Sequence, residues 1–556
     1  MEVCMETKKW SLNNAVKNWY IIVSVAGFAV MQIRLNPSYV ISLIGMLIAA
    51  VYIIGRTGTI SDYVKGQNKY IRIYSFVNSV GIVYANYNIM FIYLESFFVS
   101  GNGKADRILS ALRIGEDDFW MWIRIFLVMA DILSFGVVYA LTGYICSKIL
   151  NVLKDIEIYR FMNGLQKSEK MIYFILLFIQ MIMTITFFRV SVAGYSGPCN
   201  IIYGTDSAIY GNIMNFLHVD ILNIRQPLLE LTASPFVGFT FLFTVIPAEN
   251  AWIASVLAQL VQVMLLFLSN IMLIKLMDIK YAKNRIAAML LLVVSYSGLE
   301  GILIVEKYIF AYFWIIIYIS WFFCGKENNK RFVSDMLIGS MVTSAFLLPF
   351  AEFERCGFSF RDTAKNMVFR ALSFMGTLML TFHLGLVYSV KISNTFSYVG
   401  TKIPWGGGGG RILQYLNFVG ACFFAPEAEI VVKEGWYTWF LCDVNFLNIG
   451  GAAVFILSVL SLLINRRDKL CRVSGIWISL SVILFILGGW GTEYNELAIY
   501  LLYFSWAFIV LLLKFFETAG KNIALMAESF CVMGILLINV NGIIDLIKFS
   551  CQYYPF

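Results

Sequence analysis

An acid stands between apolar residues in the stretch IIYGTDSAIYGNIMNF (201–216). The carboxylate of Asp206 could act as a general base, taking the proton from a hydroxyl group as that hydroxyl attacks another molecule. Apolar residues follow at positions 209, 213, 216 and 217, a spacing typical of a helix that lies at an interface. Asp206 would then stand at the N-terminal end of that helix, so helix capping is its structural alternative.

A small set of basic residues could bind a phosphate group. Arg225 lies in NIRQPLLELTASPF (223–236), and a guanidinium can hold phosphate through two parallel hydrogen bonds. Lys402 and Arg411 flank the glycine run in WGGGGGR (405–411), where positive charge could stabilise a departing phosphate. The structural alternatives are a lipid-headgroup contact or a salt bridge for Arg225, and a loose connector for the glycine run.

Glu306 and Lys307 are neighbouring ionisable residues inside the apolar stretch GLEGILIVEKYIFAYFWIIIYI (298–319). Ionisable groups at a membrane edge are candidates for function by default. Lys307 could contact a phosphate, and Glu306 could orient it or a sugar hydroxyl. Their structural alternative is a mutual salt bridge at the interface.

Metal chemistry is poorly supported by the residue types. The chain has two histidines, and none of its ten cysteines forms a C-x-x-C pair. Zinc and haem sites need such residues in clusters. We therefore predict no metal-ligating residue.

The elements that must position these residues are membrane helices. The 556 residues are 60% hydrophobic and 14% charged, whereas soluble domains carry about 25% charged residues. Apolar runs of about 20 residues recur, which predicts an all-α polytopic membrane protein. Basic residues beside spans explain the net charge of +8 better than nucleic-acid binding does. We predict spans near 19–33, 38–54, 73–100, 119–147, 171–190, 252–275, 286–305, 308–324, 371–389, 449–465, 473–489, 496–513 and 522–544.

The basic residues also predict the orientation. Lysine and arginine are frequent near the N-terminus and in 55–72 and 148–170, but residues 191–250 contain only Arg225. The positive-inside rule then places the N-terminus in the cytoplasm. Two long segments, 191–250 and 390–448, would face the extracytoplasmic side. Because both are rich in aromatic and apolar residues, we expect functional loops there.

The interval VSDMLIGSMVTSAFLLPFAE (333–352) is ambiguous. As one full span it would place the basic segment INRRDKLCR (464–472) outside. A re-entrant pair of half-helices keeps both of its ends cytoplasmic, with Thr343, Ser344 and Pro349 as hairpin residues. The prediction is therefore about 13 transmembrane helices and one re-entrant hairpin.

The order of motifs resembles a known superfamily. A span is followed by TDSAIY, a polar-Pro-Leu turn and a small-Pro-Phe entry into the next span. This order resembles the GT-C superfamily, membrane glycosyltransferases that use polyprenyl-phosphate sugars, and looks most like a bacterial branch of it. GLEGILIVEKYIFAYFWIIIYI and GGWGTEYNELAIYLLYFSWAF (488–508) fit the same resemblance. It covers roughly residues 171–545, so we predict an N-terminal four-helix segment, 1–170, and a GT-C-like catalytic region, 171–556.

The resemblance implies roles for individual residues. Asp206 would be the catalytic base, and its neighbour is Ser207 where many relatives have a second acid, so an acid pair for a divalent metal is not supported. Gln226 stands where relatives often have histidine. The predicted donor-phosphate and substrate-binding residues are Arg225, Glu306, Lys307, Lys402, Arg411, Glu493 and Asn495.

The predicted function is sugar transfer from a polyprenyl-phosphate donor to a glycan or lipid of a bacterial cell envelope, on the outer side of the cell membrane. Two alternatives remain: a transporter or flippase of lipid-linked glycans, and a ligase or polymerase of whole glycans. Transporters place polar residues on broken helices near the bilayer midplane. Most polar candidates here lie in predicted external loops, which favours an enzyme.

Overall fold

The computed structural model describes most of the chain, and contacts group it into two units. The first unit is Met1–Asn151, Tyr210–Ala254 and Ala371–Lys391, and the second is Val152–Ile209, Ser255–Arg370 and Ile392–Phe556. The described residues are 66–99, 115–192, 226–245, 252–303, 307–326, 329–380, 408–426, 428–433, 436–441, 445–490 and 500–553, with 23, 25, 26 and 497 besides. The division predicted at residue 170 stays a prediction.

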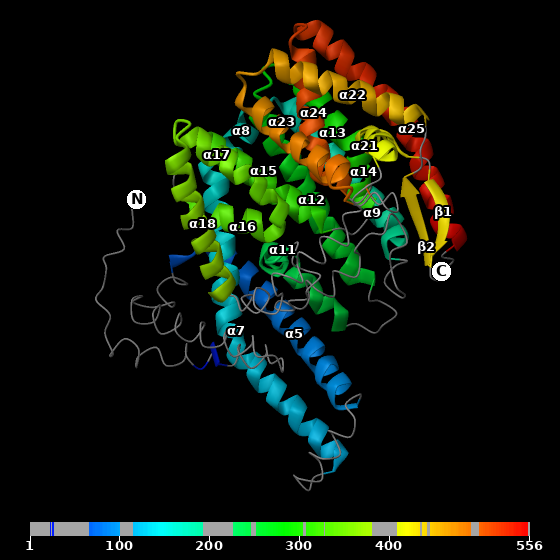
Figure 1. The fold of residues 1–556 in the computed structure, drawn as a ribbon. Helices are drawn as coiled ribbons and strands as arrows, with labels where there is room; N and C mark the ends of the chain where they lie inside the picture. The colour runs from blue at the N-terminus through cyan, green and yellow to red at the C-terminus, as the bar shows by residue number, and fades with distance from the viewer. Residues whose placement is uncertain are drawn as a thin grey trace. The chain divides into compact units, whose positions relative to one another are not determined.

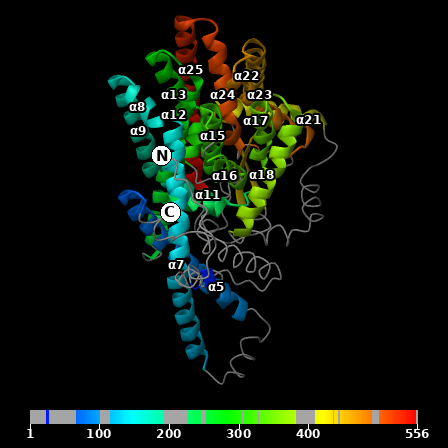
Figure 2. The same cartoon turned by 90° about the vertical axis from the view of Figure 1, so that its left-hand side faces the viewer.

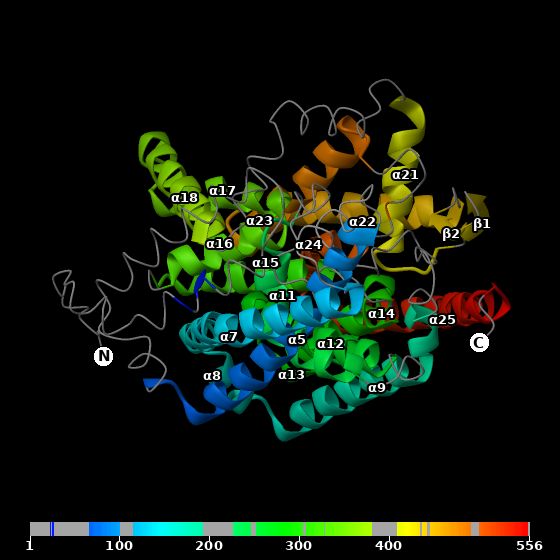
Figure 3. The ribbon, with the colours of Figure 1, turned by 90° about the horizontal axis from the view of Figure 1, so that it is seen from below.

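The first unit is built on two long helices, α5 (Lys69–Val99) and α7 (Glu116–Asp155). They lie side by side, and the rings of Phe76 and Phe135 meet with centroids 5.5 Å apart (Figure 3). A short helix, α11 (Leu229–Val237), and a 3₁₀ helix, η2 (Gly238–Val245), run against α5. A Cβ on Gly81 would lie 2.0 Å from the carbonyl oxygen of Gly238, so α5 and η2 touch backbone to backbone.

The second unit holds the remaining helices, apart from the residues of α18 after Arg370, and a hairpin (Figure 1). Its N-terminal half contains α8 (Ile158–Gly164), α9 (Lys167–Val192), α12 (Trp252–Met277), α13 (Ala282–Val294), α14 (Tyr296–Leu303), α15 (Tyr308–Cys324), α16 (Lys330–Ser340), the 3₁₀ helix η4 (Val342–Phe346), α17 (Leu347–Arg355) and α18 (Phe360–Leu380). Its C-terminal half contains α21 (Gly408–Ala421), β1 (Ala428–Lys433), β2 (Trp436–Leu441), α22 (Asn445–Ile464), α23 (Lys469–Val482), the π-helix η5 (Ile483–Leu487), α24 (Leu501–Glu517) and α25 (Lys521–Tyr553). Figure 2 shows α13, α24 and α25 running alongside one another.

Six described helices are long and apolar enough to cross a membrane, and a bent pair, α13 with α14, makes a seventh. The six include α7, α9, α12 and α25, all of which contain a predicted span. Large apolar side chains such as Phe174, Ile449 and Phe530 are exposed on three of the six, as lipid-facing surfaces require. The described residues are thus mainly helical, with six or seven apolar helices that fit a multi-pass membrane protein, while the full count of 13 spans stays a prediction.

The segment 390–448, predicted as a loop, contains regular structure in its described part. Gly408, Gly409 and Gly410 form the first turn of α21, whose later residues Tyr415 and Phe418 are buried. β1 and β2 pair antiparallel, with Ala428 opposite Leu441. The described residues are otherwise helical, as predicted, and this one hairpin forms where β-branched and aromatic residues are concentrated. Close approach of α21 to α22 needs glycine: a Cβ on Gly451 would lie 1.8 Å from the carbonyl oxygen of Leu416.

One predicted span, 286–305, is broken. The axes of α13 and α14 differ in direction by 57°, and Ser295 between them has an extended ψ of 146°. A break frees backbone groups that apolar surroundings cannot satisfy. The backbone N–H of Tyr296 donates to the carbonyl of Phe423, 3.0 Å away, and the hydroxyl of Ser297 donates to that of Cys422 at the same distance. The end of α21 thus supplies partners for one side of the break.

Asn539 of α25 satisfies the other side of the break. Its amide nitrogen donates to the carbonyl oxygens of Val294 (2.7 Å) and Phe423 (2.8 Å). Its oxygen accepts the backbone N–H of Ala425 at 2.7 Å. The side chain is fully buried, so a single amide holds the end of α13, the residues after α21 and α25 together.

Replacing Asn539 by leucine should destabilise the protein by about 1–3 kcal/mol for each buried group left without a partner. Leucine has a similar volume but no polar atom, so the carbonyl of Val294 loses the donor that Asn539 provides. The measurement is the melting temperature in detergent. Asn465→Leu is the matched control, because Asn465 directly follows α22 and is partly exposed. This change should lower the melting temperature less. Equal shifts in the two variants would show that the break does not depend on Asn539.

The interval 333–352 is not one continuous helix. It contains most of α16, the 3₁₀ turn η4 and most of α17, so Thr343 and Ser344 lie at a break. Its return to the same side of the membrane stays a prediction.

A buried ionic cluster joins α16, α17 and α18 beside this break. Glu352, fully buried, forms an ion pair with Arg370, and its other oxygen accepts from Lys330 at 3.2 Å and from Asn366 at 3.1 Å. The guanidinium of Arg370 also donates to Ser334. Burial by itself would raise the pKa of Glu352, but the charges of Arg370 and Lys330 hold that pKa below its ordinary value of 4.5.

The stability of the chain should therefore fall in acid. A carboxyl whose pKa is lower in the folded state stabilises the fold above its unfolded pKa, and that contribution disappears as the pH falls through the folded pKa. The melting-temperature gap between wild type and Glu352→Gln should be widest near pH 7 and should shrink below about pH 4.5. Thermal melts of both proteins from about pH 7 to pH 3 check this, and a constant gap would contradict it.

Candidate functional site

Two of the predicted site residues are described, and they belong to one group of side chains. Lys307 stands at the start of α15, and Arg411 lies in the first turns of α21. The others, Asp206, Arg225, Glu306, Lys402, Glu493 and Asn495, lie outside the described residues. The group is therefore built upward from Lys307 and Arg411.

Lys307 adjoins an aromatic contact between α15 and α24. It is only 7% exposed, which for a lysine requires polar or charged company. The next residue, Tyr308, meets the ring of Tyr500 edge to face at 5.3 Å and that of Tyr503 at 6.0 Å. These contacts fix the start of α15 against the start of α24.

Arg411 reaches the same aromatic residues through the end of α23. There α23 widens into the π-helix η5, whose Gly488 donates its N–H to the carbonyl of Ile483 at 2.8 Å. Gly489 follows with φ of 65°, a left-handed conformation that favours glycine. A Cβ on Gly489 would lie 2.7 Å from the guanidinium carbon of Arg411, so the arginine head lies directly on this backbone. π-helical turns of this kind are frequent at functional sites.

Trp490 closes the link between the two basic residues. Its indole nitrogen donates to the hydroxyl of Tyr500 at 2.7 Å. Tyr308 and Trp490 both contact Tyr500, Lys307 directly precedes Tyr308, and Arg411 lies on Gly489, which directly precedes Trp490. We call Lys307, Tyr308, Arg411, Trp490, Tyr500 and Tyr503 the Lys–Arg cluster, and Figure 1 shows α15, α21 and α24, which supply half of it, within the second unit.

The hydroxyl groups at the break of 333–352 join the Lys–Arg cluster. The hydroxyl of Tyr503 lies 2.8 Å from those of both Thr343 and Ser344. The carbonyl oxygen of Tyr503 accepts the indole N–H of Trp477 at 2.9 Å. Tyr503 is thus held at both its ring and its backbone, and it ties η4 to α24.

This arrangement suits a ligand that combines phosphate and sugar. Two basic residues, one with a compact and one with a planar charged group, adjoin in sequence or space the residues of an aromatic group. The basic ends can hold phosphate oxygens, and ring faces can stack against a sugar ring. Among the described residues, no group of three or more His, Cys, Asp or Glu side chains could hold a metal ion.

Sequence reasoning missed the tyrosines and hydroxyls of this group. Tyr308 and Trp490 lie in the two stretches that carry the resemblance, but their aromatic side chains read as ordinary interfacial residues. Thr343 and Ser344 were predicted only as hairpin residues. The one indication in the sequence was their position. Each of these residues lies beside the end of a helix, where a side chain need not face lipid.

Comparisons with known proteins do not identify the chain: no family model, no curated protein and no solved structure matches it. The chemistry of the Lys–Arg cluster is therefore argued from its own residues.

Proposed function

We propose that the chain transfers a sugar from a polyprenyl-phosphate donor to a glycan or lipid of the cell envelope, on the extracytoplasmic side. The observation that carries the proposal is that Lys307 directly precedes Tyr308 and Arg411 lies on Gly489 directly before Trp490, while Tyr308 and Trp490 both contact Tyr500. A lipid-phosphate leaving group needs positive charge as it departs. A sugar attached to it needs a flat apolar surface beside that charge.

Each residue has a defined task in the proposed reaction. The hydroxyl of the acceptor attacks the anomeric carbon, its proton passes to Asp206, and the bond from that carbon to the phosphate oxygen breaks. The departing lipid phosphate keeps the bonding electron pair, and Lys307 and Arg411 stabilise its added charge. Arg225, Glu306, Lys402, Glu493 and Asn495 are proposed substrate contacts from the sequence. No nucleotide and no metal takes part in this scheme.

The transporter alternative has its own supporting observation. The breaks at Ser295 and at η5 are discontinuities of the kind that line substrate sites in transporters. Here, however, Asn539, Tyr296 and Ser297 satisfy the backbone around Ser295, so this break has less need of a substrate. We therefore place transport second.

Replacing Lys307 or Arg411 by glutamine should weaken binding of a lipid phosphate. Each charge-assisted hydrogen bond contributes about 1.5–3 kcal/mol, so each variant should lose roughly 10- to 100-fold in affinity. Farnesyl phosphate is a suitable probe, titrated into the purified protein in detergent. Lys307→Arg should restore binding only in part, because a planar fork and a compact ammonium differ in geometry.

Lys548→Gln is the control, since Lys548 is an exposed lysine near the end of α25 that pairs with Asp545. It should bind farnesyl phosphate as wild type does. Mass spectrometry of envelope glycans from a deletion strain, complemented with each variant, tests the transfer itself. A missing sugar supports the enzyme, whereas an intact glycan retained on its lipid carrier inside the cell favours a flippase. Full binding by both glutamine variants would place the phosphate site elsewhere.

A further inference from the structure

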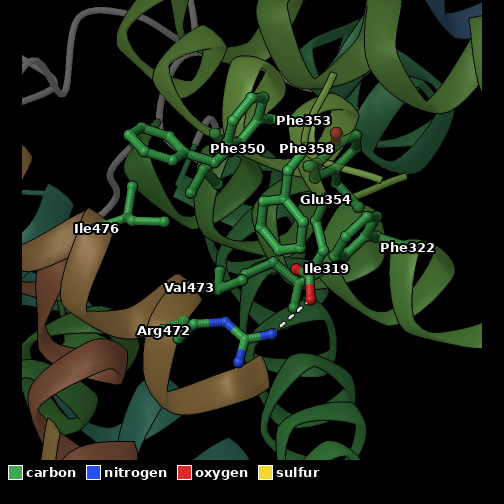
Figure 4. A pocket seen from close by; sticks show the side chains of 12 residues that line it. Ile319, Phe322, Phe350, Phe353, Glu354, Phe358, Arg472, Val473 and Ile476 are labelled. Atoms are coloured by element: carbon green, nitrogen blue, oxygen red, sulfur yellow. Dashed lines mark hydrogen bonds and ion pairs between the residues drawn. The ribbon is translucent and has the colours of Figure 1, made fainter. Parts of the chain in front are cut away.

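A concave site lies between α15, α17 and α23, near the start of α23. It is a crevice of about 110 Å³ lined mainly by apolar side chains, and Figure 4 shows Phe322, Phe350, Phe353 and Phe358 around it. Arg472 forms an ion pair with Glu354 at its edge. The crevice thus combines an apolar interior with a charged rim.

Two features of the crevice are unusual for a simple packing defect. Phe358 is 65% exposed and has φ of 66°, a conformation that is an outlier for a bulky residue. Such strain persists where the surroundings impose it, and it clusters at functional positions. Tyr318, only 2% exposed, also lines the crevice, and its hydroxyl has no hydrogen-bond partner among the described residues.

The rim of the crevice is strongly basic. Arg472 donates to the backbone carbonyls of Arg466 (3.3 Å) and Arg467 (3.0 Å), which holds the α22–α23 turn beside the crevice. The side chain of Lys469 is 57% exposed and lies 3.8 Å from Glu354. The acid of this turn, Asp468, caps α23 by accepting the N–H groups of its first turn. Four basic residues therefore gather here beside two acids.

We propose that this crevice binds one acyl chain of an anionic phospholipid, with the lipid phosphate held by the basic α22–α23 turn. The chain would lie among the phenylalanine rings, and the hydroxyl of Tyr318 would donate to an ester carbonyl. Clusters of basic residues beside a membrane helix attract anionic headgroups, each contributing about 1 kcal/mol. Free phosphate would leave the apolar crevice empty, and a zwitterionic lipid would gain less from the turn.

The phospholipid site is separate from the Lys–Arg cluster. Arg472 stands near the first residue of α23, whereas Gly489, which contacts Arg411, lies beyond its last residue. None of the residues that line the crevice belongs to the Lys–Arg cluster, although Tyr503 of that cluster accepts the indole N–H of Trp477 on the same helix. The positive-inside prediction places the crevice in the inner leaflet and the Lys–Arg cluster at the outer face. The phospholipid is thus neither donor nor acceptor of the proposed reaction.

The test uses the full chain purified in a neutral detergent. Dioctanoyl phosphatidylglycerol, dioctanoyl phosphatidylcholine and inorganic phosphate are added separately, and native mass spectrometry and melting temperature are measured. We expect a one-to-one complex and a raised melting temperature with phosphatidylglycerol. Phosphatidylcholine should bind more weakly, and phosphate should have no effect. Equal binding of the two lipids, or equal stabilisation by phosphate alone, would overturn the proposal.

Three variants separate the parts of the site. Arg466→Gln with Arg467→Gln should weaken phosphatidylglycerol binding about 30-fold, from about 1 kcal/mol for each charge. Tyr318→Phe, which removes only the hydroxyl, should weaken both lipids by about two- to tenfold. Ile476→Trp should block the crevice and abolish the complex. The control, Arg160→Gln with Lys548→Gln, removes two exposed charges elsewhere and should bind as wild type does. If the control loses as much binding as the Arg466 and Arg467 variant, the effect is one of net charge and the site is disproved.

Discussion

An Asp206→Asn variant should lose sugar transfer by about 10²–10⁴-fold while keeping its wild-type melting temperature. Removing a general base typically has an effect of this size on rate. The two proposed roles of Asp206 respond differently to asparagine. Asparagine caps a helix about as well as aspartate, so a capping role survives the change. It cannot take a proton at neutral pH, so catalysis by a base does not survive.

The measurement is transfer by purified protein at matched expression and melting temperature. Asp220→Asn, at the next acid of the same predicted loop, is the matched control and should keep most of the activity. Asp206→Ala would lose both a cap and a base, so it should also lower the melting temperature, by an amount corresponding to about 0.5–2 kcal/mol. Near-normal transfer by Asp206→Asn would leave Asp206 as a cap and remove the main residue-level argument for an enzyme.

Replacing Arg370 by methionine should destabilise the protein by about 3–5 kcal/mol. The substitution leaves the carboxylate of Glu352 fully buried with Lys330 as its remaining cationic partner, and the side chain of Lys330 is partly exposed. Removing one member of a buried ion pair leaves a charge that neither water nor a full partner compensates. Thermal melts in detergent measure the loss.

A double variant shows whether charge is the cause. Glu352→Leu combined with Arg370→Met replaces both charges by apolar groups, and such replacements are often neutral or stabilising. It should therefore recover most of the stability lost by the single change. The exposed pair Glu157–Arg160 is the control, since Arg160→Met should change stability by less than about 1 kcal/mol. A double variant as unstable as the single one would mean that hydrogen bonds or shape, rather than charge, hold this cluster.

The positions of the described helices were predictable because apolar runs report burial in lipid directly. The run 308–324 matches α15, and the run 522–544 lies inside α25. The apolar pattern alone was enough to locate these helices, because a helix makes its own backbone hydrogen bonds wherever its neighbours lie. Orientation and site roles rest on charge counts and on a resemblance, and they remain predictions.

The breaks and the site geometry could not be predicted, because they depend on contacts between distant residues. Ser295 stands in an apolar run that reads as continuous, and Asn539 and the carbonyls of Cys422 and Phe423, all far along the chain, make the interruption tolerable. The glycines before Arg411 have a low helix propensity and therefore predict a loop. The buried residues that follow them nevertheless make a helix favourable. The meeting of Lys307 and Arg411 likewise has no local signature.

The clamp at Asn539 sets an order of events during biosynthesis. The carbonyl of Val294 leaves the ribosome 245 residues before the amide that satisfies it. At about 5–20 residues per second, roughly 12–50 s pass between the two. Over that interval the nascent α13–α14 break must find other partners, in water, in the translocation machinery or in a membrane chaperone. The helices that surround the site can therefore reach their final packing only after translation has passed α25, which makes this chain a late folder.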